Sequence, residues 1–139
     1  MNLISPAIID TDILSEILKR RDPQVVKTAA AYLGAQRQFA FSATTFYEIV
    51  RGLKAKRASR QLRQFQNFCQ HCLVLPITEE ILDGAADLWV LADHAGHSNN
   101  DADLIIAATA LAQKRVLVTA NTGHFSWIPG LTVENWRQS

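Results

Sequence analysis

Short, continuous apolar runs alternate along the chain with longer stretches in which apolar residues recur every three to four positions. Such a run is typical of a strand buried on both faces, and the wider spacing is typical of a helix with one buried face. The runs predict strands at residues 7–9, 39–42, 73–75 and 116–118, with a weaker fifth strand at 131–133. The spaced stretches predict helices over about residues 13–20, 24–33, 46–53, 59–71, 81–95 and 104–113.

Residues with strong positional preferences mark several ends of these elements. Asp22 followed by Pro23 predicts an N-cap and a first helical position, while Gly34 and Gly96 predict helix stops. Because strands alternate with helices, the pattern predicts an α/β fold with a short parallel sheet sandwiched between helices. The chain has 139 residues, of which 48% are hydrophobic, so we expect a single domain over residues 1–139.

Charge is nearly balanced overall but locally segregated. The net charge is +1, so any affinity for nucleic acid must come from a local patch. No acid lies between Glu48 and Glu79, and the intervening segment carries six positive charges, at Arg51, Lys54, Lys56, Arg57, Arg60 and Arg63. This run is either a solvated helix face or a track for a nucleic-acid backbone, and the sequence leaves both interpretations open.

Three acidic residues lie where the predicted fold brings distant segments together. Asp10 ends the first strand, Glu48 lies early in the helix after the second strand, and Asp103 lies in the first turn of the apolar helix 104–113. Because open α/β sheets bind ligands outside the carboxyl ends of their strands, we expect these three carboxylates to converge at that edge. For Asp12, at a predicted N-cap, and for Asp101, we favour helix capping over metal ligation.

The chemistry of this acid set points to a cation. Several carboxylates in one pocket repel each other unless a cation lies between them. Hard oxygen ligands without a histidine cluster suit Mg²⁺ or Mn²⁺ rather than zinc. Such a cation lowers the pKa of a bound water and clamps the oxygens of a phosphodiester. The acids therefore predict hydrolytic phosphoryl-transfer chemistry.

Four segments carry a family resemblance. Residues 8–16 (IIDTDILSE), 42–48 (SATTFYE) with Gly52, and 101–110 (DADLIIAATA) resemble the three core motifs of PIN-domain ribonucleases. More narrowly, they resemble VapC-like toxins of bacterial VapBC-type toxin–antitoxin modules. The family's tail is resembled by residues 118–121 (VTAN), His124-Phe125, 128–131 (IPGL) and 134–136 (ENW). The four segments occur in order over nearly the whole chain.

The resemblance implies a single PIN-like nuclease domain acting as a metal-dependent endoribonuclease. Asp10, Glu48 and Asp103 are then the catalytic acids and ligands of Mg²⁺ or Mn²⁺, while Asp12, Asp101 and Asn121 are further candidate ligands. The implied partners are RNA, a cognate antitoxin that wraps the toxin and blocks the site, and a second copy in a homodimer. The candidate RNA-binding residues are Arg51, Lys54, Lys56, Arg57 and Arg60, a patch that could hold an antitoxin's acidic groups instead.

The chain departs from the family pattern at two positions. Asp12 stands where the family usually has Asn, which adds a negative charge. Asn121 stands where many members have a fourth acid, and its neutral oxygen leaves open whether one metal or two are bound. A side-chain cap of the turn before Gly123 is the alternative role for Asn121.

The sequence leaves two rival functions open. The pattern Asp10-Thr11-Asp12 resembles the start of haloacid-dehalogenase-like phosphatases, although Leu14 occupies the place of that family's Thr. The other rival is a non-catalytic PIN-like module that binds RNA or protein.

The remaining features carry less chemistry. Cys69 and Cys72 continue the apolar stripe of their helix, so we expect core packing rather than zinc binding. His124 is either an ordinary exposed side chain or a contact to the scissile phosphate, and Trp127 is expected to anchor the core or an interface. We expect neither a signal peptide nor a membrane span, and hence a cytoplasmic protein.

Overall fold

Five short parallel strands and six α-helices make up the fold. A computed structural model describes residues 4–137. The elements in chain order are β1 (Ala7–Ile9), α1 (Thr11–Lys19), α2 (Pro23–Gln36), β2 (Ala40–Ser42), α3 (Ala43–Ala55), α4 (Ser59–Cys69), β3 (Leu73–Leu75), α5 (Glu79–Ala95), α6 (Asp101–Ala112), β4 (Val116–Val118), the 3₁₀ turn η1 (Thr122–His124) and β5 (Val133–Glu134). The predicted α/β fold with a short parallel sheet is confirmed.

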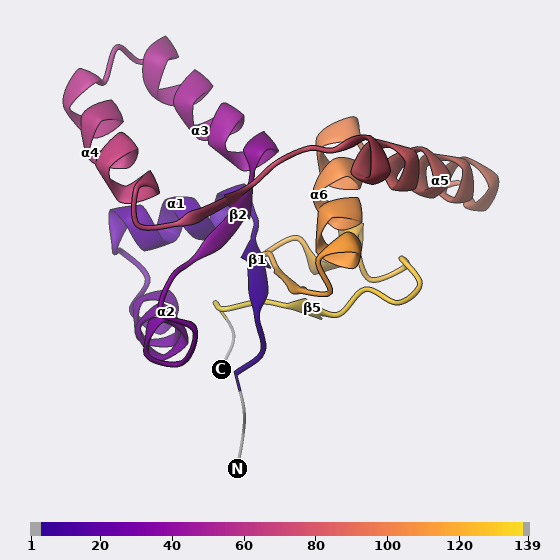
Figure 1. Cartoon of the computed structure of the whole chain (residues 1–139), viewed down its shortest axis with the longest axis horizontal. Coiled ribbons are helices and arrows are strands. Elements are labelled where there is room, and N and C mark those ends of the chain that lie inside the picture. The colour runs from indigo at the N-terminus through magenta and orange to yellow at the C-terminus, as the bar shows by residue number, and fades with distance from the viewer. Residues whose placement is uncertain (1–3, 138–139) are drawn as a thin grey trace.

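The strands lie in the order β3-β2-β1-β4-β5. Parallel ladders join β2 to β3, β1 to β4 and β4 to β5, and contacts between β1 and β2 bring the two groups together. Helices α1 to α4 lie on one side of the strands, and α5 and α6 lie on the other (Figure 1). Because β1 is in the middle, the residue that follows it lies at the centre of the carboxyl edge.

Strand alternation divides the core into two clusters. Ile8 and Leu117 pack with α5 and α6, whereas Ile9 and Val118, one residue further along each strand, pack with helices α1 to α4. Successive side chains point to opposite faces of a sheet, so strands covered on both faces need apolar residues at every position. This explains why the strand segments are continuous apolar runs.

Helix α6 is the best buried of the six helices. Six of its side chains are buried, at Leu104, Ile106, Ala107, Ala108, Thr109 and Ala110. The helix that carries Asp103 in its first turn is therefore packed on several sides, which confirms the prediction of a buried helix.

Two details differ from the sequence-based expectations. Helix α2 runs past Gly34 to Gln36 and ends at Arg37, which adopts φ 71°. Gly34 does not share this left-handed conformation, so it lies inside the helix and does not end it. The fifth strand begins two residues later than expected, because Val133 rather than Leu131 pairs with Leu117.

Two sequence-based expectations about side chains are borne out. Cys69 and Cys72 are half-buried against the α1–α4 side of the core, and burial raises the pKa of Cys72 to about 12. Trp127 is half-buried against the other core cluster. In the part of the chain that the structure describes, no helix has the length and apolar character needed to cross a membrane.

Candidate active site

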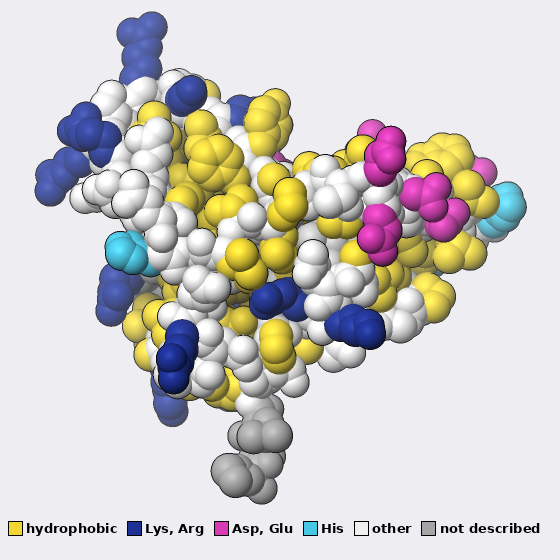
Figure 2. Space-filling view, in the orientation of Figure 1, with side chains coloured by type: hydrophobic (Ala, Val, Ile, Leu, Met, Phe, Trp, Pro, Cys, Tyr) yellow, Lys and Arg dark blue, Asp and Glu magenta, His cyan; other side chains and the backbone are white. Residues whose placement is uncertain are grey.

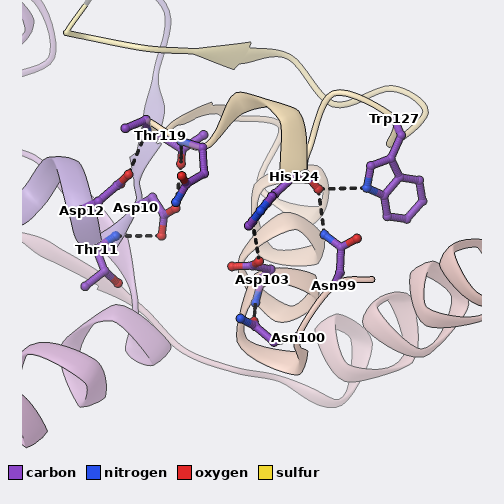
Figure 3. A network of polar contacts seen from close by, with 11 residues as sticks. Asp10, Thr11, Asp12, Asn99, Asn100, Asp103, Thr119, His124 and Trp127 are labelled. Atoms are coloured by element: carbon purple, nitrogen blue, oxygen red, sulfur yellow. Dashed lines mark hydrogen bonds and ion pairs between the residues drawn. The ribbon is translucent and has the colours of Figure 1, made fainter. Parts of the chain in front are cut away.

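Asp10 is a buried carboxylate at the carboxyl end of the central strand. Its side chain is 7% exposed, and its backbone N–H continues the ladder by donating to the Val118 carbonyl at 2.8 Å. Oδ1 accepts from the Thr11 backbone N–H at 2.7 Å, and Oδ2 accepts from the Thr119 hydroxyl at 2.8 Å (Figure 3). The aligned register of β1 and β4 places Thr119 directly beside Asp10.

The N-cap of α1 is Asp10, so the prediction of Asp12 as the cap is wrong. Asp10 is the single residue between the end of β1 and the start of α1, so the carboxylate that follows the strand becomes the cap. Asp12 lies in the first turn, where its Oδ1 accepts from Ile13 N–H at 2.8 Å and its Oδ2 accepts from Ala120 N–H at 3.0 Å. Oδ2 of Asp12 therefore ties α1 to the segment just after β4, while Oδ1 accepts within α1 itself. Asn has only one oxygen for these two roles.

Glu48 approaches the same edge from α3. Its Oε1 accepts a 2.8 Å hydrogen bond from the Thr11 hydroxyl, which lies 3.1 Å from the Thr45 hydroxyl. Helix α3 begins directly after β2, so Glu48 in its second turn comes within reach of Thr11, the first residue of α1. This threonine contact holds the Glu48 carboxylate beside the strand-end acids.

Asp103 lies in the first turn of α6, whose N-cap is Asn100 and not Asp101. The Asn100 side chain accepts from the Asp103 backbone N–H at 2.8 Å. Oδ2 of Asp103 lies 3.4 Å from Nδ1 of His124, which belongs to η1. Asp101 is exposed and borders a groove between α5 and α6, so the capping prediction for Asp101 is wrong.

The electrostatics show that these carboxylates share one field. Burial raises the pKa of Asp10 to about 6, with further contributions from Asp12 and Asp103, and the hydrogen bonds from Thr119 and Thr11 oppose the rise. Burial also raises the pKa of Asp103, and Glu48 and Asp12 add to this, whereas His124 lowers it. Asp10 and Glu48 thus each lie within electrostatic reach of Asp103, and Asp12 is a further acid in this group; their joint role as a site stays a prediction.

The carboxylate oxygens at this edge are ligands that suit a hard dication, but the side chains are not close enough together to surround one. Asp10, Asp12, Glu48 and Asp103 supply carboxylate oxygens, and a cation would relieve both the burial cost and the mutual repulsion of the buried acids. As the side chains of residues 4–137 stand, no three His, Cys, Asp or Glu groups are close enough together to hold one ion.

Asn121 lies on the exposed turn after β4. Its backbone N–H donates to the Thr119 hydroxyl at 3.1 Å, and its carbonyl accepts from His124 N–H at 3.0 Å. The side chain of Asn121 makes no capping hydrogen bond to η1, so the turn is held by the backbone and not by a side-chain cap.

Sequence reasoning missed the threonines and asparagines that hold the acids. Thr119 lies in the segment 118–121 that carries part of the family resemblance, and its position directly after a strand that pairs with β1 is the signal that could have assigned its contact with Asp10. Thr11 directly follows Asp10, and Asn100 lies three residues before Asp103. Small polar side chains at the start of a helix are typical of residues that form capping hydrogen bonds.

The basic segment lies on the α3–α4 hairpin. We call Arg51, Lys54, Lys56, Arg57, Arg60 and Arg63 the basic hairpin; all six are exposed, and none is in an ion pair with an acid among the described residues. Lys and Arg side chains gather over this end of the molecule, and acids gather over α5 (Figure 2). Arg51, one helical turn from Glu48, lies with its guanidinium 5.2 Å from the centre of the exposed Tyr47 ring.

Comparisons with known proteins identify the fold. The PIN domain family profile matches residues 7–130. The structure is similar to VapBC2 from Rickettsia felis bound to a promoter DNA fragment, with a TM-score of 0.84 and 21% identity over 94% of this chain and 98% of that one. It is also similar to FitAcB from Neisseria gonorrhoeae, with a TM-score of 0.79 and 25% identity over 96% of this chain and 99% of that one.

No curated protein matches the chain. The family match nevertheless covers β1 to β4 and all six α-helices, and it includes Asp10, Glu48 and Asp103. The chain belongs to the PIN-domain family.

Proposed function

We propose that the protein is a Mg²⁺- or Mn²⁺-dependent endoribonuclease that acts as the toxin of a toxin–antitoxin pair. The observation that carries the proposal is the buried Asp10, whose pKa is raised to about 6 by burial and by the neighbouring acids Asp12 and Asp103. Perturbed carboxylates gathered at one sheet edge are typical of a functional site, and membership of the PIN-domain family supports a nuclease.

The proposed roles follow from the geometry of the chain's own residues. Asp10, Glu48 and Asp103 would hold the dication, Asp12 would add negative potential while bracing α1 against β4, and Thr11 and Thr119 would orient carboxylates. When bound, the dication supplies a Lewis acid that withdraws charge from the phosphodiester and favours ionisation of water. The basic hairpin would align the RNA backbone beside Glu48.

A protein partner is part of the proposal. The neighbouring solved structures include a toxin–antitoxin complex from Klebsiella pneumoniae, 25% identical to this chain. Two adjoining apolar grooves of about 320 and 340 Å³ lie along α1 and share Leu18 and Phe68, and exposed Lys19 and Arg20 border them. We propose that an antitoxin segment with apolar and acidic side chains occupies these grooves, near enough to the basic hairpin to compete with RNA.

The proposed homodimer has a surface that supports it. Leu82, Trp89, Val90 and Leu91 of α5 are about half exposed. Helix α5 carries five acids and no Lys or Arg, whereas the basic hairpin is uniformly positive. A second copy would bury these apolar side chains and bring opposite charges together.

The phosphatase alternative loses its support, because the family profile is that of a PIN domain. A non-catalytic PIN-like module remains the rival, and an assay of catalysis separates it from the nuclease.

The first prediction concerns catalysis. Asp10→Asn and Asp103→Asn should each lower the rate of Mg²⁺-dependent cleavage of single-stranded RNA by more than about 100-fold. Loss of a residue that only supports a metal ligand costs up to about 100-fold, and loss of a ligand itself should cost more. Asp87→Asn, which removes an exposed acid from α5, should cleave at the wild-type rate. Cleavage products are quantified on gels, with a phosphomonoester as the second substrate.

Near wild-type cleavage by either site variant would reject the site assignment. Hydrolysis of the phosphomonoester but not of RNA would restore the phosphatase. A folded wild-type protein that cleaves neither substrate with Mg²⁺ or Mn²⁺ would support the non-catalytic module.

The second prediction concerns the pH dependence of stability without metal. The pKa of Asp10 is 3.8 in the unfolded chain and about 6 in the fold, so the native state binds more protons between these values and loses stability as pH rises through them. The full penalty above pH 6 is about 3 kcal/mol for a pKa that is about 2 higher in the fold. Asp10→Asn should remove this penalty. The altered hydrogen bond to Thr119 should cost about 1 kcal/mol, so the net gain in the free energy of unfolding is smaller than the penalty.

In EDTA at pH 7.5, Asp10→Asn should therefore melt about 6 °C above wild type, and at pH 4 the gain should nearly vanish. Asp87→Asn is the control for a change of one surface charge. A gain that is equal at both pH values, or absent at pH 7.5, would mean that Asp10 carries no such penalty.

The third prediction concerns the basic hairpin. Replacing Lys54, Lys56, Arg57 and Arg60 by Gln should weaken binding of single-stranded RNA in EDTA and lower the log–log salt slope by about 0.7 for each phosphate that is no longer neutralised. Replacing Lys19, Arg21, Lys27 and Arg37, four exposed cations elsewhere, is the matched control. Fluorescence anisotropy at several salt concentrations measures both. Equal slopes for the two variants would assign the hairpin to solvent or to the partner protein.

A further inference from the structure

The connector between α5 and α6, residues 96–100, is fixed at both ends by helix capping. Gly96 adopts φ 73° and its N–H donates to the last turn of α5. Asn100 caps α6 by accepting from the Asp103 backbone N–H. A β-carbon is disfavoured in the left-handed conformation of Gly96, so the chain turns here at low cost only with glycine. The connector thus has a defined path up to the acid it precedes.

The middle of this connector is hydrogen-bonded to the backbone of the η1 turn. The Asn99 side-chain N–H donates to the His124 carbonyl at 2.7 Å, and the Trp127 indole N–H donates to the same oxygen at 2.9 Å. The Trp127 ring also stacks on His97 of the connector, with centroids 4.6 Å apart and planes 14° apart. A carbonyl oxygen accepts two hydrogen bonds, so both acceptor sites are filled. We call Asn99, Trp127 and the His124 carbonyl the carbonyl clamp.

The carbonyl clamp and the Asn100 cap each hold one partner of the contact between His124 and Asp103. Asn100 fixes the backbone of Asp103, and its neighbour Asn99 fixes the backbone of His124. The imidazole of His124 then meets the Asp103 carboxylate at 3.4 Å, although the imidazole itself is 59% exposed (Figure 3). An exposed side chain has many rotamers, so the backbone on which it stands decides how often it meets its partner.

We propose that the carbonyl clamp positions His124 against Asp103 and thereby orients the Asp103 carboxylate for the dication. This inference rests on the proposed function, because it concerns the same metal site. Ligating carboxylates are commonly held by hydrogen bonds from a second layer of residues, and loss of such a partner costs about 10- to 100-fold in metal affinity or activity. His124, Asn99 and Trp127 are therefore positioning residues and not ligands.

The chain allows the hydrogen bond to be separated from the ring stack. Trp127→Phe keeps an aromatic ring against His97 and removes the indole donor, while Asn99→Ala removes the second donor. Mn²⁺ affinity is measured by titration calorimetry, and the melting temperature is measured in EDTA. The double variant should bind Mn²⁺ about 10-fold more weakly than wild type. Asn67→Ala, at an exposed position on α4, should leave the affinity unchanged.

A second pair of variants tests His124 directly. His124→Ala should weaken Mn²⁺ binding by about 10-fold, and His124→Asn, which places an amide N–H near the position of Nδ1, should restore most of the affinity. Restored Mn²⁺ affinity in His124→Asn would show that the N–H donor at this position matters, and not only the volume of the side chain. These single substitutions at an exposed side chain also keep the test valid should the clamp double variant fail to fold.

Each outcome is decisive. Wild-type Mn²⁺ affinity in the clamp double variant or in His124→Ala overturns the clamp as a positioning device, and a lower metal-free melting temperature with unchanged affinity reduces it to a loop support. Failure of the wild-type protein to bind Mn²⁺ at all overturns the proposed function, and the clamp with it. The two failures differ in whether wild type binds.

Discussion

The burial of an acidic side chain at the end of the central strand is the constraint on which the rest of the site depends. Asp10 is covered by its own strand, by α1 and by the end of β4, and its carboxylate faces other acids. Two short hydrogen bonds compensate only part of that cost. Helices α1, α3 and α6 all begin at this edge, and the partial positive charge of a helix N-terminus offsets some of the remaining repulsion. A dication would complete the compensation.

Much of the framework was predictable because it depends on runs of apolar residues. The run before Asp10 and the almost wholly apolar segment after Asp103 each predicted a buried element, and the two acids follow from the ends of those elements. Parallel strands with crossover helices leave few other arrangements. The candidate acids thus needed only the element order and the rule that ligands gather at carboxyl ends.

What the sequence did not predict depends on register and on single residues at helix ends. Thr119 bonds Asp10 only because β1 and β4 pair without a shift, and sequence alone does not reveal this pairing. Asp10 is a cap because it is the single residue between β1 and α1, and Asn100 is a cap because it is the last residue of the connector before α6. Gly34 shows the converse, since glycine permits a helix stop without requiring one.

Charge segregation connects the site with its proposed partners. The basic hairpin starts one turn after Glu48, so a phosphate backbone on it would lead toward the carboxylates. Those carboxylates repel the same backbone unless a cation lies between them, which makes metal and RNA binding interdependent. A partner that covers the basic hairpin would therefore block the proposed RNA binding without touching the acids.

We propose that the carboxyl edge binds a dication, and anomalous diffraction from a crystal soaked in Mn²⁺ would locate the ion. We expect a manganese peak in contact with the Asp10 and Asp103 carboxylates. A Mn²⁺-saturated crystal with no peak at this edge, or with manganese only on the acids of α5, would contradict it.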